Sequence, residues 1–228
     1  MIQQSAQSDV FIQQLRDCLR RETRGARTIK IAKHENVYTC GEQGETIYFI
    51  ESGQVKLMIV SSEGRCCISA VHGTGEIFGE LSLTGSDERL ETAMAMEDTA
   101  LKIIPASKFL ALLGKNSLLE GFVRYLAVRI ADQQEVISQL VTADSEHRLG
   151  MTLLELARKL GRKESHRLVL EHKFSHEELS EIVGTTRPRI SAFMRRFRSL
   201  GLIETHAPHC LVVRDKELSD YLAQLALG

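Results

Sequence analysis

The sequence has no tryptophan, and its aromatic fraction is only 5%. We therefore expect a core built mainly from aliphatic side chains. No apolar run approaches the roughly 20 residues that a membrane-spanning helix needs. The first ten residues are polar and lack the basic-then-apolar order of a secretory signal peptide. These absences favour a cytoplasmic protein with no membrane partner.

The cysteines do not suggest disulfide bonds, because they are odd in number and irregularly spaced. They are Cys18, Cys40, Cys66, Cys67 and Cys210. A reducing compartment is the simpler interpretation. Adjacent side chains on a strand point to opposite faces, so Cys66 and Cys67 would chelate a metal poorly and are assigned to core and surface. Redox sensing by this pair stays open as an alternative.

Enzyme and metal motifs are also missing. The chain has no Gly-x-Ser-x-Gly elbow, phosphate-binding loop or His-Glu-x-x-His helix. His72 is assigned to a turn, and nothing around it in the sequence supports a haem role. His206, His209 and Cys210 lack a fourth ligand at a suitable spacing. We therefore assign no enzymatic activity, no catalytic residue, no metal site and no certain cofactor.

The first half of the chain has the pattern of short strands and tight turns. Half of the 16 glycines lie between Gly41 and Gly85, and glycine supplies the positive φ angles that tight turns need. Residues 46–50, 55–60, 66–71 and 99–104 are rich in strand-forming side chains, and residues 55–60 alternate like a half-buried strand. The pattern predicts an antiparallel β-roll over residues 1–117, with a short helix beginning at Pro105.

Residues 118–143 are predicted to form one long helix. Apolar residues, with one glutamine, recur at alternating spacings of four and three: Leu119, Val123, Leu126, Ile130, Gln133, Ile137 and Leu140. This heptad stripe is buried best against a second copy of the same helix, so we assign it to a homodimer interface. An amphipathic helix that packs on its own β-roll is the alternative.

The second half, residues 144–228, is predicted to be helical with a small hairpin. Asp144 or Ser145 can cap the next helix. In the segment from Phe174 to Leu200, Ser175 and Glu178 have the spacing of a capping box. A glycine turn at residues 183–185 then leads to a second helix that starts near Thr186. This order is typical of a helix-turn-helix unit.

The second helix has the composition of a DNA-reading element. Five arginines occur between residues 187 and 200, with no aspartate or glutamate among them. The edges of the DNA major groove present acceptors to arginine. Residues 201–204 and 210–214, with Pro208 at their turn, are predicted to form the wing of a winged helix, and residues 216–225 a closing helix. A merely solvated charged face is the alternative.

At this point the chain resembles the CRP/FNR family of bacterial regulators. The resemblance rests on residues 41–53, 75–81, 92–95 and 177–187, and on the order of β-roll, long helix and winged helix. It implies an α+β protein that binds a palindromic operator as a homodimer and contacts RNA polymerase. It also implies an effector pocket between the roll and the long helix.

The resemblance assigns the effector pocket to eight residues: Gly79, Glu80, Leu81, Arg89, Glu91, Thr92, Gln133 and Gln134. In the cAMP-binding members an arginine precedes the residue matching Thr92, but this chain has Glu91, which would repel a cyclic phosphate. The loop between Leu83 and Thr92 is one residue longer than in the cAMP-binding members. A slipped register could therefore place Arg89 at the arginine position. We therefore expect an effector other than cAMP, such as a cyclic dinucleotide.

The resemblance assigns DNA contacts to Ser175, Thr185, Thr186, Arg187, Pro188, Arg189, Ser191, Ala192, Arg195, Arg196 and Arg198. Arg187 matches the arginine that reads guanine in the family, whereas Pro188 and Ala192 replace two base-reading residues. Arg195, Arg196 and Arg198 are assigned to phosphates. An effector-independent or redox-responsive regulator, and a sensing module that acts through protein partners, stay open as alternatives.

Overall fold

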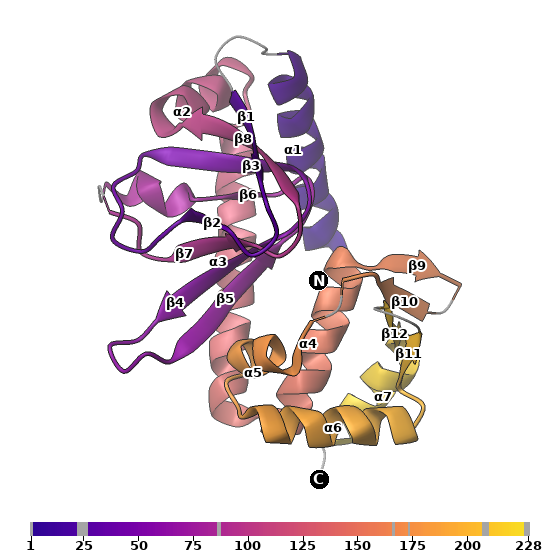
Figure 1. Cartoon of the computed structure of the whole chain (residues 1–228). Helices are drawn as coiled ribbons and strands as arrows, with labels where there is room; N and C mark the ends of the chain where they lie inside the picture. Colours follow the sequence, from indigo (N-terminus) through magenta and orange to yellow (C-terminus); the bar gives the residue numbers. More distant parts are fainter. Residues whose placement is uncertain are drawn as a thin grey trace. The chain divides into compact units, whose positions relative to one another are not determined.

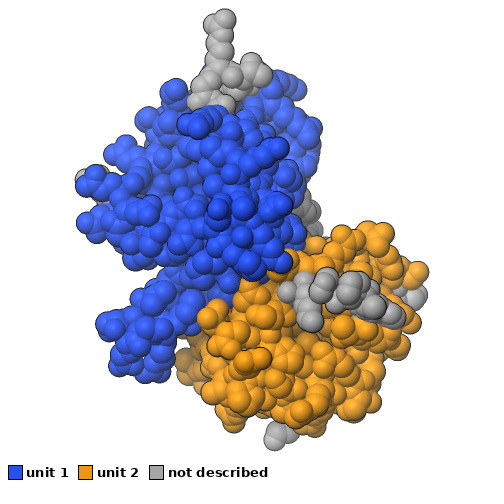
Figure 2. All heavy atoms as spheres, in the orientation of Figure 1, with its two compact units in different colours: residues 1–134 blue, residues 135–228 orange. Residues whose placement is uncertain are grey.

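The computed structural model describes residues 2–21, 27–85, 88–165, 167–172, 174–206 and 210–225. Pro208 and His209, which the sequence analysis assigns to the wing region, lie outside these residues. The chain divides into two compact units, residues 1–134 and residues 135–228, shown in two colours in Figure 2. The boundary falls within one long helix, α3 (Leu119–Thr142). The β-roll, long helix and winged helix-turn-helix follow one another along the chain, which confirms the expected α+β fold class.

Two four-stranded antiparallel sheets form the roll of unit 1, in the orders β1-β8-β3-β6 and β2-β7-β4-β5. The strands are β1 (Arg27–Ile31), β2 (Asn36–Tyr38), β3 (Thr46–Ser52), β4 (Val55–Val60), β5 (Cys66–His72), β6 (Ile77–Phe78), β7 (Thr92–Ala95) and β8 (Thr99–Pro105). A short 3-10 helix, η1 (Glu80–Thr84), follows β6. The roll encloses a core of buried aromatic and aliphatic side chains, among them Tyr38, Tyr48 and Phe78.

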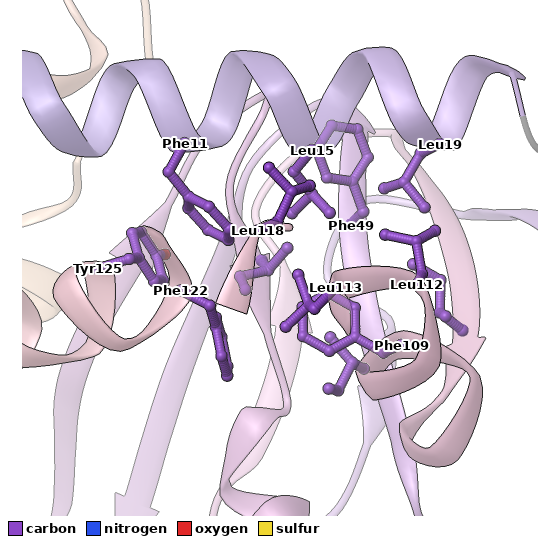
Figure 3. Close-up of a cluster of buried hydrophobic side chains, with 13 residues drawn as sticks. Phe11, Leu15, Leu19, Phe49, Phe109, Leu112, Leu113, Leu118, Phe122 and Tyr125 are labelled. Carbon is purple, nitrogen blue, oxygen red and sulfur yellow. The ribbon is translucent and has the colours of Figure 1, made fainter. Parts of the chain in front are cut away.

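The helical side of unit 1 holds a second core (Figure 3). It lies among α1 (Ile2–Arg21), α2 (Ala106–Lys115), α3 and strand β3. Phe11 from α1 packs against Phe122 and Tyr125 of α3, with ring centroids 6.0 and 5.5 Å away. A Cβ added at Gly121 would lie 2.9 Å from the Phe11 ring, so this glycine permits the close approach of the two helices. One side of α3 is thereby packed against the core of unit 1. Helix α1 was not predicted from the sequence.

Two expectations for the roll were wrong. Residues 55–60 do not alternate in burial, because Val55–Met58 are all buried whereas Ile59 and Val60 are 49% and 58% exposed. The outer part of the β4–β5 hairpin extends beyond the sheet, as Figure 1 shows, and there neither face is covered. His72 lies at the end of β5 and not in a turn. It is buried, and its Nδ1 is 3.3 Å from a carboxylate oxygen of Glu76.

In its described residues, unit 2 contains the end of α3, four further helices and one sheet. The elements are α4 (Ser145–Leu160), β9 (Arg162–Glu164), β10 (Arg167–Leu170), α5 (His176–Val183), α6 (Arg187–Ser199), β11 (Ile203–His206), β12 (Cys210–Arg214) and α7 (Asp215–Leu225). The strands pair antiparallel in the order β11-β12-β10-β9, and β11 and β12 form the expected wing (Figure 1). Asp144 caps α4 by accepting a hydrogen bond from the backbone N–H of His147 at 2.8 Å. Among the described residues, no helix has the length and apolarity to cross a membrane.

Candidate functional site

The helix-turn-helix is formed by α5 and α6, and its first helix begins at the expected capping box. The hydroxyl of Ser175 accepts from the backbone N–H of Glu178 at 3.1 Å, and Glu178 accepts from the backbone N–H of Ser175 at 3.0 Å. Gly184 ends α5 with φ of 66°, a left-handed conformation that favours glycine. Pro188 lies in the first turn of α6, where its missing N–H costs little. The local sequence therefore determines both ends of the turn.

Helix α6 has a buried and an exposed face. Ile190, Met194 and Phe197 are buried against the rest of unit 2. All five of its arginines lie among the exposed residues, and the helix carries no acidic side chain. A straight helix repeats every 3.6 residues, so Pro188, Ala192 and Arg195 lie together at the centre of the exposed face. The exposed face is therefore cationic and has a small residue at its middle.

The five arginines of α6 fall into two groups. Arg196 pairs with Glu146 at 2.9 Å, and Nε of Arg198 donates to Thr205 Oγ1 at 3.2 Å. Among the described residues, no hydrogen bond or ion pair holds the guanidinium groups of the other three, Arg187, Arg189 and Arg195. These three groups can reach an external ligand without losing an internal partner.

Glu146 and Tyr221 form a support for α6 that the sequence analysis missed. The Tyr221 hydroxyl donates to Glu146 Oε1 at 2.7 Å, while Glu146 Oε2 receives Arg196. Burial and the neighbouring Glu146 carboxylate raise the pKa of Tyr221 to about 12. The carboxylate thus joins α4, α6 and α7, and it holds Arg196 in one place.

A cluster of four buried charges lies in unit 1 at the expected effector site. Glu80 at the start of η1 is 2.6 Å from Nη1 of Arg129 on α3, and the side chains are 7% and 18% exposed. Burial disfavours the charge on Arg129, but Glu80, Tyr125 and Glu76 together more than offset it, so the pKa of Arg129 is raised. Within the described residues, the second carboxylate oxygen of Glu80 and the buried hydroxyl of Tyr125 have no hydrogen-bond partner. Buried polar atoms without partners are uncommon and are typical of ligand sites.

Arg89 is buried in the same part of the roll. Its guanidinium lies 4.3 Å from the Tyr38 ring centroid and donates to the carbonyl oxygens of Gly79 at 3.3 Å and Thr46 at 2.8 Å. Gly79 has φ of 82°, and a Cβ there would lie 2.9 Å from the Thr46 carbonyl, so only glycine fits. Arg89 is therefore held by aromatic and carbonyl groups of the roll.

Glu91 is buried beside Tyr38, whose hydroxyl donates to Glu91 Oε1 at 3.1 Å. Burial raises the pKa of Glu91 above its ordinary value, although the Tyr38 hydrogen bond opposes this shift. Thr92 is also buried, and its hydroxyl accepts from the backbone N–H of Cys40 at 3.0 Å. The two carboxylates and two guanidinium groups make the cluster close to neutral.

The remaining sequence-predicted effector residues are exposed. Leu81 is 38% exposed, and Gln133 and Gln134 of α3 face solvent in the single chain. The apolar stripe of α3 is exposed as well, at 51% for Leu119, 59% for Val123, 56% for Ile130, 61% for Ile137 and 49% for Leu140. Leu126 differs, because it is half-buried against the core of unit 1. The described residues contain no group of three or more His, Cys, Asp or Glu side chains that could hold a metal.

Two family models match the chain in the order of its units. The cyclic nucleotide-binding domain matches residues 28–116, and the Crp-like helix-turn-helix domain matches residues 147–218. The chain belongs to the CRP/FNR family of transcription regulators. This membership confirms the resemblance identified from the sequence motifs.

Relatives of this CRP/FNR regulator carry names that agree with its family assignment. The cyclic AMP receptor protein of Thermus thermophilus is 29% identical over 82% of this chain and 83% of its own. A CRP-like cAMP-activated global transcriptional regulator of Mycobacterium tuberculosis is 24% identical over 86% and 88% of the two chains. The solved structure of a CRP/FNR-family transcriptional regulator from Thermus thermophilus has a TM-score of 0.69 and 25% identity, with 87% of this chain and 98% of that chain covered. These names support the expectation of a regulator and not an enzyme.

The sequence analysis of this CRP/FNR regulator missed the α3 side chains that face the roll. Phe122, Tyr125 and Arg129 follow one another at spacings of three and four, which forms a second stripe beside the exposed one. Arg129 brings the ion-pair partner of Glu80 into the effector region, and Tyr125 adds a buried hydroxyl one turn earlier on α3. The periodicity of this second stripe was the signal that could have identified them.

Proposed function

We propose that this CRP/FNR-type regulator binds a palindromic DNA operator as a homodimer and that a small molecule other than cAMP controls it. In this proposal α6 enters the major groove, α3 pairs with its copy in a second chain, and the effector binds beside Glu80 and Arg129. The protein acts in the cytoplasm together with RNA polymerase.

The cationic, acid-free exposed face of α6 is the observation that carries the DNA-binding proposal. Arg187, Arg189 and Arg195 extend from this face without internal partners among the described residues. Arg187, at the first turn, is the candidate for a bidentate contact to guanine, and Arg195 is a candidate for a phosphate. Because Arg196 and Arg198 already have internal partners, they contribute to affinity from fixed positions.

Selection of duplexes from a randomised library tests this proposal. The wild-type chain should enrich a two-fold symmetric sequence with half-sites about one helical turn apart. Enrichment of no sequence over the starting library would contradict sequence-specific binding. A sensing module that acts only through protein partners would give that result.

The exposed apolar stripe of α3 supports the homodimer. Leu119, Val123, Ile130 and Ile137 are each more than half exposed, and Leu140 is 49% exposed. Such a stripe is stabilised by a second copy of the helix. Replacing Ile137 with glutamate should convert dimers to monomers in sedimentation velocity. The control is Leu110→Glu on α2, where a leucine that is 44% exposed lies off the stripe. Equal effects of both substitutions would contradict this interface.

The neutral charge cluster supports an effector other than cAMP. Arg129 is paired with Glu80, Arg89 is held by carbonyl groups and aromatic rings, and Glu91 would face a cyclic phosphate with the wrong charge. A ligand that presents hydrogen-bond donors and not a phosphate to the two carboxylates, such as a cyclic dinucleotide whose nucleobases face them, suits the cluster better. Calorimetry should detect no micromolar binding of cAMP, and such binding would overturn this part of the proposal. Mass spectrometry of the purified protein tests whether a ligand is retained.

One observation favours effector-independent regulation as a second candidate. The Glu80–Arg129 ion pair joins η1 to α3 directly through two side chains of the protein. A ligand-free preparation that binds its selected duplex as tightly as any ligand-loaded preparation would favour this candidate.

A further inference from the structure

Arg148, in the first turn of α4, contacts the ends of two other helices in unit 2. Its Nη1 donates to the carbonyl oxygen of Ala143 at 2.7 Å, just beyond the last residue of α3. Its Nε donates to the carbonyl oxygen of Val183 at 3.0 Å, and its Nη2 reaches that of Gly184 at 3.4 Å. Val183 ends α5, and Gly184 is the cap of that helix. One guanidinium group therefore caps two helix C-termini.

The physical reason for this contact lies in the helix ends. The last carbonyl groups of a helix have no partner within it and carry partial negative charge, so a cation there is favourable. The planar guanidinium offers several donors in a fixed geometry and can bind two sets of carbonyls at once. An ammonium group is a single point charge and cannot reproduce this geometry.

The residues that Arg148 contacts lie in the turn that leads into α6, so they determine where α6 starts. Gly184 is followed by Thr185 and by Thr186, the N-cap residue of α6, and Thr186 makes no side-chain capping bond. Leu140 of α3 also approaches the turn, since a Cβ added at Gly184 would lie 3.3 Å from its Cδ2 atom. The turn is thus tied to the end of α3 through Arg148 and Leu140.

We propose that Arg148 is a positioning residue for DNA recognition, which fixes the turn before α6 to the C-terminal end of α3. This inference rests on the proposed DNA-binding function. Arg148 itself contacts no DNA in this account. Its loss would leave the cationic face of α6 intact but release the turn that orients Arg187 toward a base.

The test compares variants of the full chain on two duplexes: the palindrome that the wild type selects and a shuffled duplex of the same composition. Arg148→Gln removes the guanidinium, and Arg148→Lys keeps the charge without the geometry. Arg158→Gln is the matched control, because Arg158 lies on the same helix and bonds to Asp215 and Ser219, away from the turn. Thermal melts and stoichiometric titration separate loss of folded protein from loss of affinity.

Both Arg148 variants should lower affinity for the selected duplex roughly tenfold or more, because hydrogen bonds to charged groups are among the strong ones. Their affinity for the shuffled duplex and their salt dependence should stay near the wild-type values. Arg158→Gln should keep the wild-type ratio between the two duplexes.

Three outcomes would overturn the inference. Wild-type discrimination by Arg148→Lys would mean that charge alone matters. Equal loss on both duplexes with a shallower salt dependence would make Arg148 a phosphate contact. A lower active fraction with an unchanged affinity ratio would leave it only a structural role. A wild-type chain that selects no duplex would refute the proposed function itself, which is a distinguishable result.

Discussion

Two buried arginines of unit 1 and three exposed arginines of α6 differ in whether the fold supplies their partners. In unit 1, Arg89 and Arg129 are buried or nearly so, and each already has partners inside the fold. In unit 2, Arg187, Arg189 and Arg195 are exposed and, among the described residues, have none. The first arrangement stabilises a closed site, whereas the second presents charge to an external anion. The same residue type therefore serves opposite purposes in one chain.

The largest expected effect comes from removing a buried partner in unit 1. Arg129→Met leaves Glu80 buried without its counter-charge and should lower the free energy of unfolding by about 3 kcal/mol. The control is Arg124→Met on the same helix, where the Arg124–Glu120 pair is 2.7 Å long but 59% and 80% exposed. This exposed pair should change stability by less than about 1 kcal/mol. Chemical denaturation measures both, and equal losses would erase the contrast between buried and exposed pairs.

The next effect concerns the exposed arginines of α6. Arg187→Ala should cost about 1–3 kcal/mol of binding free energy and relax specificity at one symmetric pair of operator positions. Arg195→Ala should instead weaken binding to all duplexes and reduce the salt slope by about one. Anisotropy titrations against single-base operator variants separate these roles. A uniform loss for Arg187→Ala would contradict its assignment to a base.

A smaller effect is expected at the start of the helix-turn-helix. Ser175→Ala removes the hydroxyl that caps α5 and should destabilise unit 2 by about 1 kcal/mol. Ser175→Thr keeps the hydroxyl and should restore most of that stability. Thermal unfolding of both variants gives the comparison. If both variants lost the same amount, the hydroxyl would not be the stabilising group.

The smallest effect is the pH dependence of Glu91. Burial holds the pKa of Glu91 above its ordinary value of 4.5, so the folded chain keeps this proton longer than the unfolded chain does. Stability from this group is therefore lost as pH rises from 4.5 through the raised pKa. Glu91→Gln can still accept from Tyr38 but does not ionise.

Denaturation of wild type and Glu91→Gln across this pH range tests the sign. The stability of the variant relative to wild type should increase with pH across the window and then level off. A relative stability that falls with pH would mean that the pKa of Glu91 is lowered in the folded chain.

Local signals allowed the helix-turn-helix to be predicted from the sequence. The Ser175–Glu178 capping box, Gly184 and Pro188 act within a few residues of one another, so their spacing alone specifies the helix ends. The charge of α6 is visible in the same way. Glycine spacing likewise predicted the roll, whose turns need positive φ angles.

Contacts between distant segments could not be predicted. Arg129 forms an ion pair with Glu80, which lies far earlier in the chain. Arg148 donates hydrogen bonds to the carbonyl oxygens of Val183 and Gly184 at the end of α5. Helix α1 has a polar first half, and its role in the core became apparent only through Phe11, Leu15 and Leu19. Such pairings depend on the tertiary fold, on which a single sequence gives little information.

The most direct test of DNA recognition is anisotropy of the full chain on its selected palindrome and on a shuffled duplex, over a series of salt concentrations. We expect one dimer per palindrome, affinity that falls steeply with salt, and a preference for the palindrome of roughly a thousandfold or more. Equal affinity for the two duplexes at every salt concentration would contradict this expectation.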